Sequence, residues 1–148
     1  MINRDLSAFR IAAVAGATLV LAGCAAAARH DGDQQTLARY RQYAGDPIDH
    51  IGNVHGYGGL SALGANEVLF WSGSNQPYLI TVNSPCEDLR FANSIGVTFN
   101  QAPDAIYTRF DSLTVSGWRC TIAEIRPIDY ARLRFDRRVA AASTKKTE

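Results

Sequence analysis

The stretch Glu67–Val82, which reads E-V-L-F-W-S-G-S-N-Q-P-Y-L-I-T-V, decides the fold class. It holds two short runs rich in β-branched, aliphatic and aromatic residues, Glu67–Trp71 and Tyr78–Val82, and a turn-forming link separates them. In the second run every other residue, starting with Tyr78, is large and apolar, so these side chains share one face of an extended strand. The link is too short for a helical crossover, and the two strands are therefore predicted to pair antiparallel.

The same pattern of short apolar segments and compact turns continues on both sides of this hairpin. A short helix carrying Leu37, Tyr40 and Ala44 is predicted before the strands, and a second one, opened by Pro127 and Asp129, after them. The expected fold class is α+β, mainly an antiparallel β meander or small open barrel with a short helix at each end. The further strands are predicted at Ile48–Val54, Leu60–Leu63, Ile95–Phe99, Ile106–Val115 and Trp118–Ile125, with a single helical turn at Pro85–Ala92.

The N-terminus has the layout of a secretory signal, with a short, net positive segment ahead of the apolar run Ile11–Leu21. As a helix this run would reach roughly 16 Å, about half of the hydrocarbon core of a bilayer, so a permanent transmembrane helix is not expected.

The apolar run ends in Leu21-Ala22-Gly23-Cys24, a tetrapeptide that resembles the bacterial lipobox. The resemblance implies cleavage after Gly23 and a mature protein that begins with an acylated Cys24. Its acyl chains, palmitate among them, would hold the protein on a membrane. Ala25 follows the cysteine, and by resemblance to the enterobacterial sorting pattern this implies the outer membrane, on the periplasmic side. The alternative is an ordinary secretory signal in which Cys24 is incidental.

These features divide the chain into four parts. Residues 1–23 are the expected lipoprotein signal peptide, and residues 24–35 the lipidated N-terminus and flexible tether. Residues 36–138 are expected to form a single β-rich domain. Residues 139–148 are expected to be a disordered tail.

Composition excludes several classes of protein. Of the 148 residues, 47% are hydrophobic, which excludes a disordered chain. The 15 basic and 14 acidic residues give a formal net charge of +1. No nucleic-acid partner is expected, because there is no basic excess to neutralise phosphates.

Two cysteines, Cys86 and Cys120, remain once Cys24 is assigned to lipid. In an oxidising compartment an even pair suggests one disulfide. Two buried thiols or a metal-binding pair are the alternatives; neither cysteine lies in a C-x-x-C or beside a histidine, and no metal is expected.

Two segments resemble a known family. Tyr78-Leu79 leads to C-x-x-L at Cys86–Leu89, and Phe110-Asp111 leads to C-x-I-x-x-I-x-P at Cys120–Pro127. Over residues 46–129 the chain is similar to small Gram-negative lipoproteins classed as domain of unknown function 6491. The resemblance implies a lipid-anchored periplasmic domain with a disulfide, and it implies no activity.

Candidates for chemistry are few. His50 and His55, with Asp49 beside them, form the one local cluster of acid–base groups, but their spacing matches no zincin motif, and polar loop residues are the expected reading. The glycine-rich segment Gly52–Gly59 lacks the features of a phosphate-binding loop and is expected to be mobile. Asp111 is expected to hydrogen-bond a turn rather than face a ligand.

Five aromatic side chains are expected in the core, where a small domain needs large residues, rather than in a ligand groove. They are Tyr57, Phe70, Trp71, Tyr78 and Trp118.

The expected function is a non-enzymatic, lipid-anchored periplasmic module that binds an envelope protein or ligand and uses no cofactor. The alternative is a small periplasmic hydrolase using His50 or His55, which requires those side chains to meet a carboxylate in a cleft.

Overall fold

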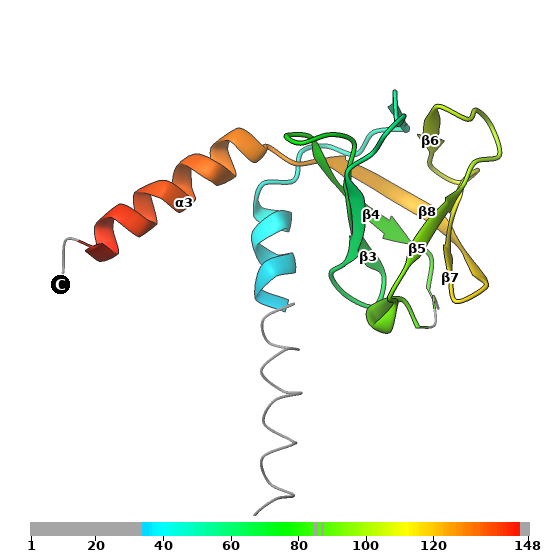
Figure 1. Cartoon of the computed structure of the whole chain (residues 1–148), viewed down its shortest axis with the longest axis horizontal. Coiled ribbons are helices and arrows are strands. Elements are labelled where there is room, and N and C mark those ends of the chain that lie inside the picture. The colour runs from blue at the N-terminus through cyan, green and yellow to red at the C-terminus, as the bar shows by residue number, and fades with distance from the viewer. Residues whose placement is uncertain (1–33, 85, 87, 146–148) are drawn as a thin grey trace, which may run out of the picture. The chain divides into compact units, whose positions relative to one another are not determined.

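The structure of the chain is a computed structural model that describes residues 34–84, 86 and 88–145 (Figure 1). The predicted signal peptide at 1–23, its cleavage site at Gly23 and the predicted lipidation site at Cys24 lie outside the described residues. None of the helices described here is long and apolar enough to span a membrane.

The core element is a six-stranded antiparallel sheet with the strand order β2-β3-β4-β8-β7-β5. The outer strands β2 and β5 approach each other, so the sheet is nearly closed like a barrel (Figure 1). A separate two-stranded sheet pairs β1 with β6. This confirms the predicted α+β class with a small open barrel. The strands are β1 (His50–Gly52), β2 (Gly59–Ala62), β3 (Glu67–Trp71), β4 (Pro77–Val82), β5 (Ile95–Thr98), β6 (Ala105–Tyr107), β7 (Ser112–Val115) and β8 (Trp118–Pro127).

The hairpin of β3 and β4 is covered on both faces, which explains its nearly continuous apolar sequence. Val68 and Phe70 of β3 point into the barrel, where they join Ile80 of β4 in the main core. The side chains between them, Leu69 and Leu79, point outward into a second apolar cluster. Alternate residues of one hairpin therefore build two cores.

Strand β8 carries a β-bulge opposite the end of β4. Thr81 pairs with Glu124 but the next residue, Val82, pairs with Ile122, so β8 has one extra residue at this point. The bulge puts Ile122 and Ile125 into the same core although they are three positions apart. This accounts for the I-x-x-I spacing in the sequence.

The helix at 34–42 and the first turn of α3 (Tyr130–Lys145), one near each end of the described chain, pack on the outward face of β3 and β4. Leu37 from the helix at 34–42 and Leu133 from α3 are 3% and 1% exposed, and both belong to the second cluster. Trp71 meets Tyr130 edge-on, with ring centroids 5.1 Å apart. Apolar packing therefore holds the start of α3 to the barrel.

Helix α3 is longer than the short helix predicted after Pro127, and it passes the predicted start of the tail at residue 139. Its N-terminus is capped by Asp129, whose carboxylate accepts a hydrogen bond from the backbone N–H of Arg132. Its second half contains Ala140–Ala142, and alanine has the highest helix propensity. The disorder predicted for residues 139–148 stays a prediction.

The predicted strand at Ile106–Val115 is wrong as a single element. The segment forms two strands, β6 and β7, which lie in different sheets. The chain turns between them, and Arg109 there has a φ of 67°. The predicted helical turn within Pro85–Ala92 is confirmed as the 3-10 helix η1 (Leu89–Phe91).

Candidate functional site

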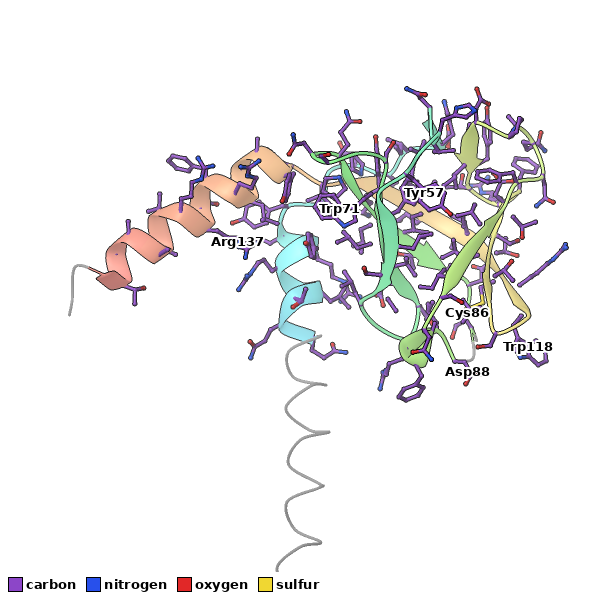
Figure 2. All side chains as sticks on the ribbon, in the orientation of Figure 1. Tyr57, Trp71, Cys86, Asp88, Trp118 and Arg137 are labelled. Atoms are coloured by element: carbon purple, nitrogen blue, oxygen red, sulfur yellow. A yellow bond between two sulfur atoms is a disulfide. The ribbon has the colours of Figure 1, made fainter. Side chains whose placement is uncertain are left out.

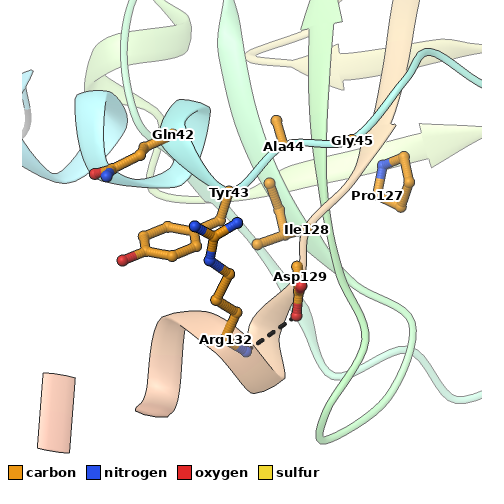
Figure 3. Close-up of a pocket in the computed structure, with 8 residues that line it drawn as sticks. All are labelled: Gln42, Tyr43, Ala44, Gly45, Pro127, Ile128, Asp129 and Arg132. Atoms are coloured by element: carbon orange, nitrogen blue, oxygen red, sulfur yellow. Dashed lines mark hydrogen bonds between the residues drawn. The ribbon is translucent and has the colours of Figure 1, made fainter. Parts of the chain in front are cut away.

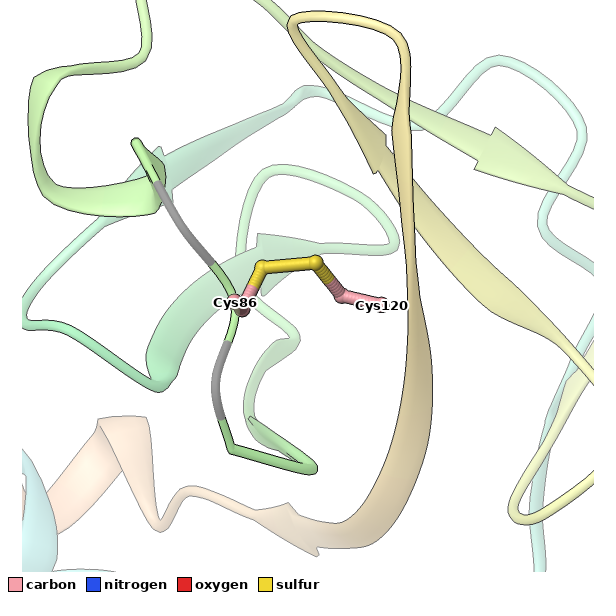
Figure 4. Close-up of a disulfide and its surroundings, with 2 residues drawn as sticks. All are labelled: Cys86 and Cys120. Carbon is pink, nitrogen blue, oxygen red and sulfur yellow. A yellow bond between two sulfur atoms is a disulfide. The ribbon is translucent and has the colours of Figure 1, made fainter.

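The two cysteines predicted to pair do form a disulfide (Figure 4). Cys86 lies in the segment after β4 and Cys120 lies on β8, and their Cα atoms are 5.6 Å apart. Both side chains are buried at the edge of the main core. The alternatives of two free thiols or a metal-binding pair are therefore wrong for this structure.

The structure does not bring the predicted acid–base cluster together. His50, on β1, is exposed, and its ring stacks on that of its cross-strand partner Tyr107 with centroids 5.1 Å apart. His55 is exposed in the following turn, and the backbone carbonyl of Asp49 accepts a hydrogen bond from Thr108. Within the described ranges neither histidine meets a carboxylate, and no three metal-ligating side chains gather there.

The glycine-rich segment after β1 is attached to the barrel at several points. Val54 is buried, and its backbone N–H donates to the carbonyl of Asp104. The backbone N–H of Gly58 donates to the carbonyl of Trp71 at 2.7 Å. Tyr57 packs on Phe70, with ring centroids 5.5 Å apart. These contacts place the loop over the end of β3, and its expected mobility stays a prediction.

The aromatic residues separate into two groups. Phe70 is fully buried and contacts the rings of Tyr57 and Tyr78, which confirms its place in the core. The predicted place in the core is wrong for Tyr57, which is 40% exposed, and for Trp118, which is 63% exposed. Trp118 is the first residue of β8, directly after the turn at Ser116-Gly117, and β8 enters the core only further along, from Cys120 onward.

Asp111 holds a turn, as predicted. Its carboxylate is fully buried and accepts hydrogen bonds from the backbone N–H groups of Asn100 and Tyr107, at 2.6 and 2.7 Å. The side chain of Asn100 donates in turn to the carbonyl of Phe110. Both carboxylate oxygens are therefore used in hydrogen bonds that hold the turn.

One surface pocket of about 420 Å³ lies where the helix at 34–42 ends and α3 begins (Figure 3). The backbone N–H of Gly45 donates to the carbonyl of Pro127, and that of Asp129 donates to the carbonyl of Tyr43, so the two wall segments are bonded to each other. The pocket is lined by Gln42, Tyr43, Ala44, Gly45, Pro127, Ile128, Asp129 and Arg132.

Tyr43 and Arg132 are the prominent polar side chains of this pocket. The Arg132 guanidinium lies over the Tyr43 ring, 6.0 Å from its centroid. The Tyr43 hydroxyl donates a hydrogen bond of 2.7 Å to the carboxylate of Asp136, one turn further along α3. That hydrogen bond raises the pKa of Tyr43 above its ordinary value, and desolvation and the negative charge of Asp136 act in the same direction.

The pocket presents an aromatic ring, a guanidinium and an amide to solvent. Its ring and guanidinium can stack on a planar group, and the Gln42 amide can donate and accept hydrogen bonds. No serine or cysteine nucleophile lies among its lining residues. Sequence reasoning missed Tyr43, Arg132 and Asp136, because Tyr43 lies 89 and 93 positions before the other two and only the cap residue Asp129 has a local signal.

Comparison with known proteins gives one match. A protein-family model described as a family of unknown function, DUF6491, matches residues 7–144. No curated protein and no solved structure matches the chain.

Proposed function

The chain belongs to the family of unknown function DUF6491, and we propose that it is a lipid-anchored periplasmic protein that serves as a non-enzymatic binding or accessory module of the cell envelope. In this proposal acyl chains on Cys24 hold it on the periplasmic side of the outer membrane. Its partner is another envelope protein or an envelope ligand.

The disulfide between Cys86 and Cys120 is the observation that carries the proposal. Disulfides form and persist in oxidising compartments, of which the periplasm is one. The pairing also leaves Cys24, at the end of the L-A-G-C tetrapeptide, as the one cysteine of three outside the bridge. The placement of the cysteines thus agrees with secretion followed by lipidation.

A binding role is supported by how the described residues are used. Apolar side chains such as Phe70, Ile80 and Leu113 fill the barrel, all of them fully buried. The buried carboxylate of Asp111 bonds to backbone groups. The pocket beside Tyr43 is a concave surface of the described residues at which a partner has polar and aromatic groups to contact.

The alternative of a hydrolase that uses His50 or His55 requires those side chains to converge with a carboxylate. His50 instead stacks on Tyr107, and His55 lies exposed in a turn. No observation on the described residues favours this second function.

The anchor is tested by fractionating cells that make the wild-type protein or Cys24→Ser, after metabolic labelling with a fatty acid. We expect the wild type to carry label and to leave the membrane with detergent but not with high salt. The variant should carry none. A wild-type protein that is unlabelled and leaves the membrane with salt would overturn the proposed anchor.

The binding place is tested by a photo-crosslinking amino acid at Gln42, which lines the pocket, in intact cells. The matched control is the same amino acid at Gln101, an exposed glutamine in the loop between β5 and β6. We expect one discrete crosslinked product from position 42 and none from position 101. The same products from both positions, or none from either, would remove the pocket from the proposal.

A further inference from the structure

One end of the barrel presents two large aromatic side chains to solvent. Phe91 in η1 is 77% exposed and Trp118 at the start of β8 is 63% exposed. We call this end, formed by η1 and the β7–β8 turn around the disulfide, the cystine end. Figure 2 shows Trp118 and Asp88 at this end, with Cys86 just above them in the view. Single exposed rings also occur elsewhere on the domain, as at Phe110 and Phe135, so whether this end is a partner surface depends on what else lies there.

The disulfide fixes the positions of both aromatic segments. Cys120 is two residues after Trp118, and its partner Cys86 accepts, through its carbonyl, a hydrogen bond from the backbone N–H of Leu89. Leu89 is fully buried and so anchors η1 in the core. The backbone on either side is thereby held while the rings of Phe91 and Trp118 remain outside.

The folded unit also begins at the cystine end. It starts at Thr36, and Leu37 packs beside Gly64 in the β2–β3 turn. In that turn the carbonyl of Asn66 accepts a hydrogen bond from Val82, at the end of β4 that leads to Cys86. Figure 1 shows the first described turn of the 34–42 helix, η1 and the β7–β8 turn at one end.

A chain anchored at Cys24 therefore enters the domain from this end. The residues between Cys24 and Thr36 can extend at most about 40 Å, at roughly 3.3 to 3.6 Å each. An acylated Cys24 would keep the bilayer within that distance of Thr36 at all times. A tether this short gives the bilayer a high effective concentration, so weak individual contacts suffice.

We propose that the cystine end rests in the headgroup region of the phospholipid bilayer, with Phe91 and Trp118 inserted. The inference rests on the proposed lipid anchor. Tryptophan and phenylalanine favour the boundary between headgroups and acyl chains. Arg90 and Arg119 are exposed and adjacent in sequence to Phe91 and Trp118, and they supply cationic groups for lipid phosphates; Asp88 is the acidic side chain described near Arg90 in the sequence. In this proposal the two aromatic rings insert into the headgroup region, and the two arginines orient the domain on the bilayer by binding lipid phosphates.

The two tryptophans of the chain, Trp71 and Trp118, provide a test with an internal control. Acylated full-length mature protein is purified from membranes and placed in phosphatidylethanolamine–phosphatidylglycerol vesicles whose acyl chains are brominated near the headgroup. Trp71→Phe leaves Trp118 as the reporter, and Trp118→Phe leaves Trp71, which packs on Tyr130 in the second cluster. Bromine quenches tryptophan only on contact.

We expect brominated lipid to lower Trp118 emission roughly twofold, as for a ring at the headgroup boundary, and to leave Trp71 emission unchanged. If Trp71→Phe does not fold, the quenching of Trp118 is obtained as the difference in quenching between the wild type and Trp118→Phe. Acylated protein with an unquenched Trp118 would overturn the docking and leave the anchor standing. The intact mass of the purified protein is measured first, and a mass without acyl chains would overturn the anchor and the docking with it.

Discussion

The buried carboxylate of Asp111 accepts a hydrogen bond from the backbone N–H of Asn100, with a donor–acceptor distance of 2.6 Å. Its second oxygen accepts from the backbone N–H of Tyr107 at 2.7 Å. One side chain thus joins the end of β6 to the loop after β5. These two hydrogen bonds hold the turn within the apolar segment at 106–115, and the segment therefore contributes to two sheets.

Asp111→Ala is expected to lower the free energy of unfolding by about 3 kcal/mol, because two charge-assisted hydrogen bonds are lost and their donors keep no partner. Asp111→Asn, which retains one acceptor oxygen, should lose less. The exposed Asp104, in the same loop region, is the matched control, and Asp104→Ala should change stability little. Urea denaturation measures all three. Equal losses of stability for Asp104→Ala and Asp111→Ala would contradict the structural role of the Asp111 hydrogen bonds.

The disulfide is expected to stabilise the domain by roughly 3 to 4 kcal/mol, the value for a closed loop of this length. Its two cysteines are separated by 34 positions. Replacing both Cys86 and Cys120 by Ser should therefore lower the urea midpoint strongly. Reductant should lower the midpoint of the wild type to the same extent and leave the double variant unchanged. A wild-type midpoint that does not respond to full reduction would show that the bridge contributes nothing.

Phe70→Ala is expected to cost about 3 to 5 kcal/mol, the range for removing a buried phenylalanine side chain. The ring is fully buried, and it contacts Tyr57 and Tyr78. Phe135→Ala removes the same group from a ring that is 65% exposed on α3, and it should cost no more than about 0.5 kcal/mol. Thermal or urea unfolding of the pair measures the difference. Similar losses would place Phe70 outside the core.

Tyr43 is expected to titrate at a higher pH than an ordinary tyrosine, because the hydrogen bond to Asp136 favours its protonated form. Folding then favours the neutral phenol. Its stabilising effect is complete below the ordinary tyrosine pKa of about 10, and it is lost as the pH rises through the raised folded value.

Asp136→Ala should bring the pKa of Tyr43 down towards its ordinary value. Carbon NMR of labelled tyrosine rings follows the titration, and the resonance missing from Tyr43→Phe identifies the residue. The other tyrosines serve as internal references. The hydrogen bond would have no role in solution if Tyr43 titrated at the same pH with and without Asp136.

Local patterns in the sequence predicted the hairpin Glu67–Val82, the turn role of Asp111 and the pairing of Cys86 with Cys120, and the structure confirms all three. Each depends on residue type and spacing within a short segment, or on a count of cysteines. The sequence also predicted the fold class, a small antiparallel barrel, because short antiparallel strands with compact turns allow few other arrangements.

Three features depend on long-range contacts and were missed. The division of the segment 106–115 depends on Asn100, which lies outside it. The exposure of Trp118 depends on where β8 leaves the core, since the residue type alone favours burial. The pocket joins Tyr43 to α3, and residues so far apart in the chain leave no shared local pattern.

Intact mass of the protein purified from membranes of its native host, before and after reduction with alkylation, tests the central claim most directly. We predict the mass of residues 24–148 carrying a glyceryl group and three acyl chains, with two thiols that alkylate only after reduction. An unacylated mass, or cysteines that alkylate without reduction, would contradict the account.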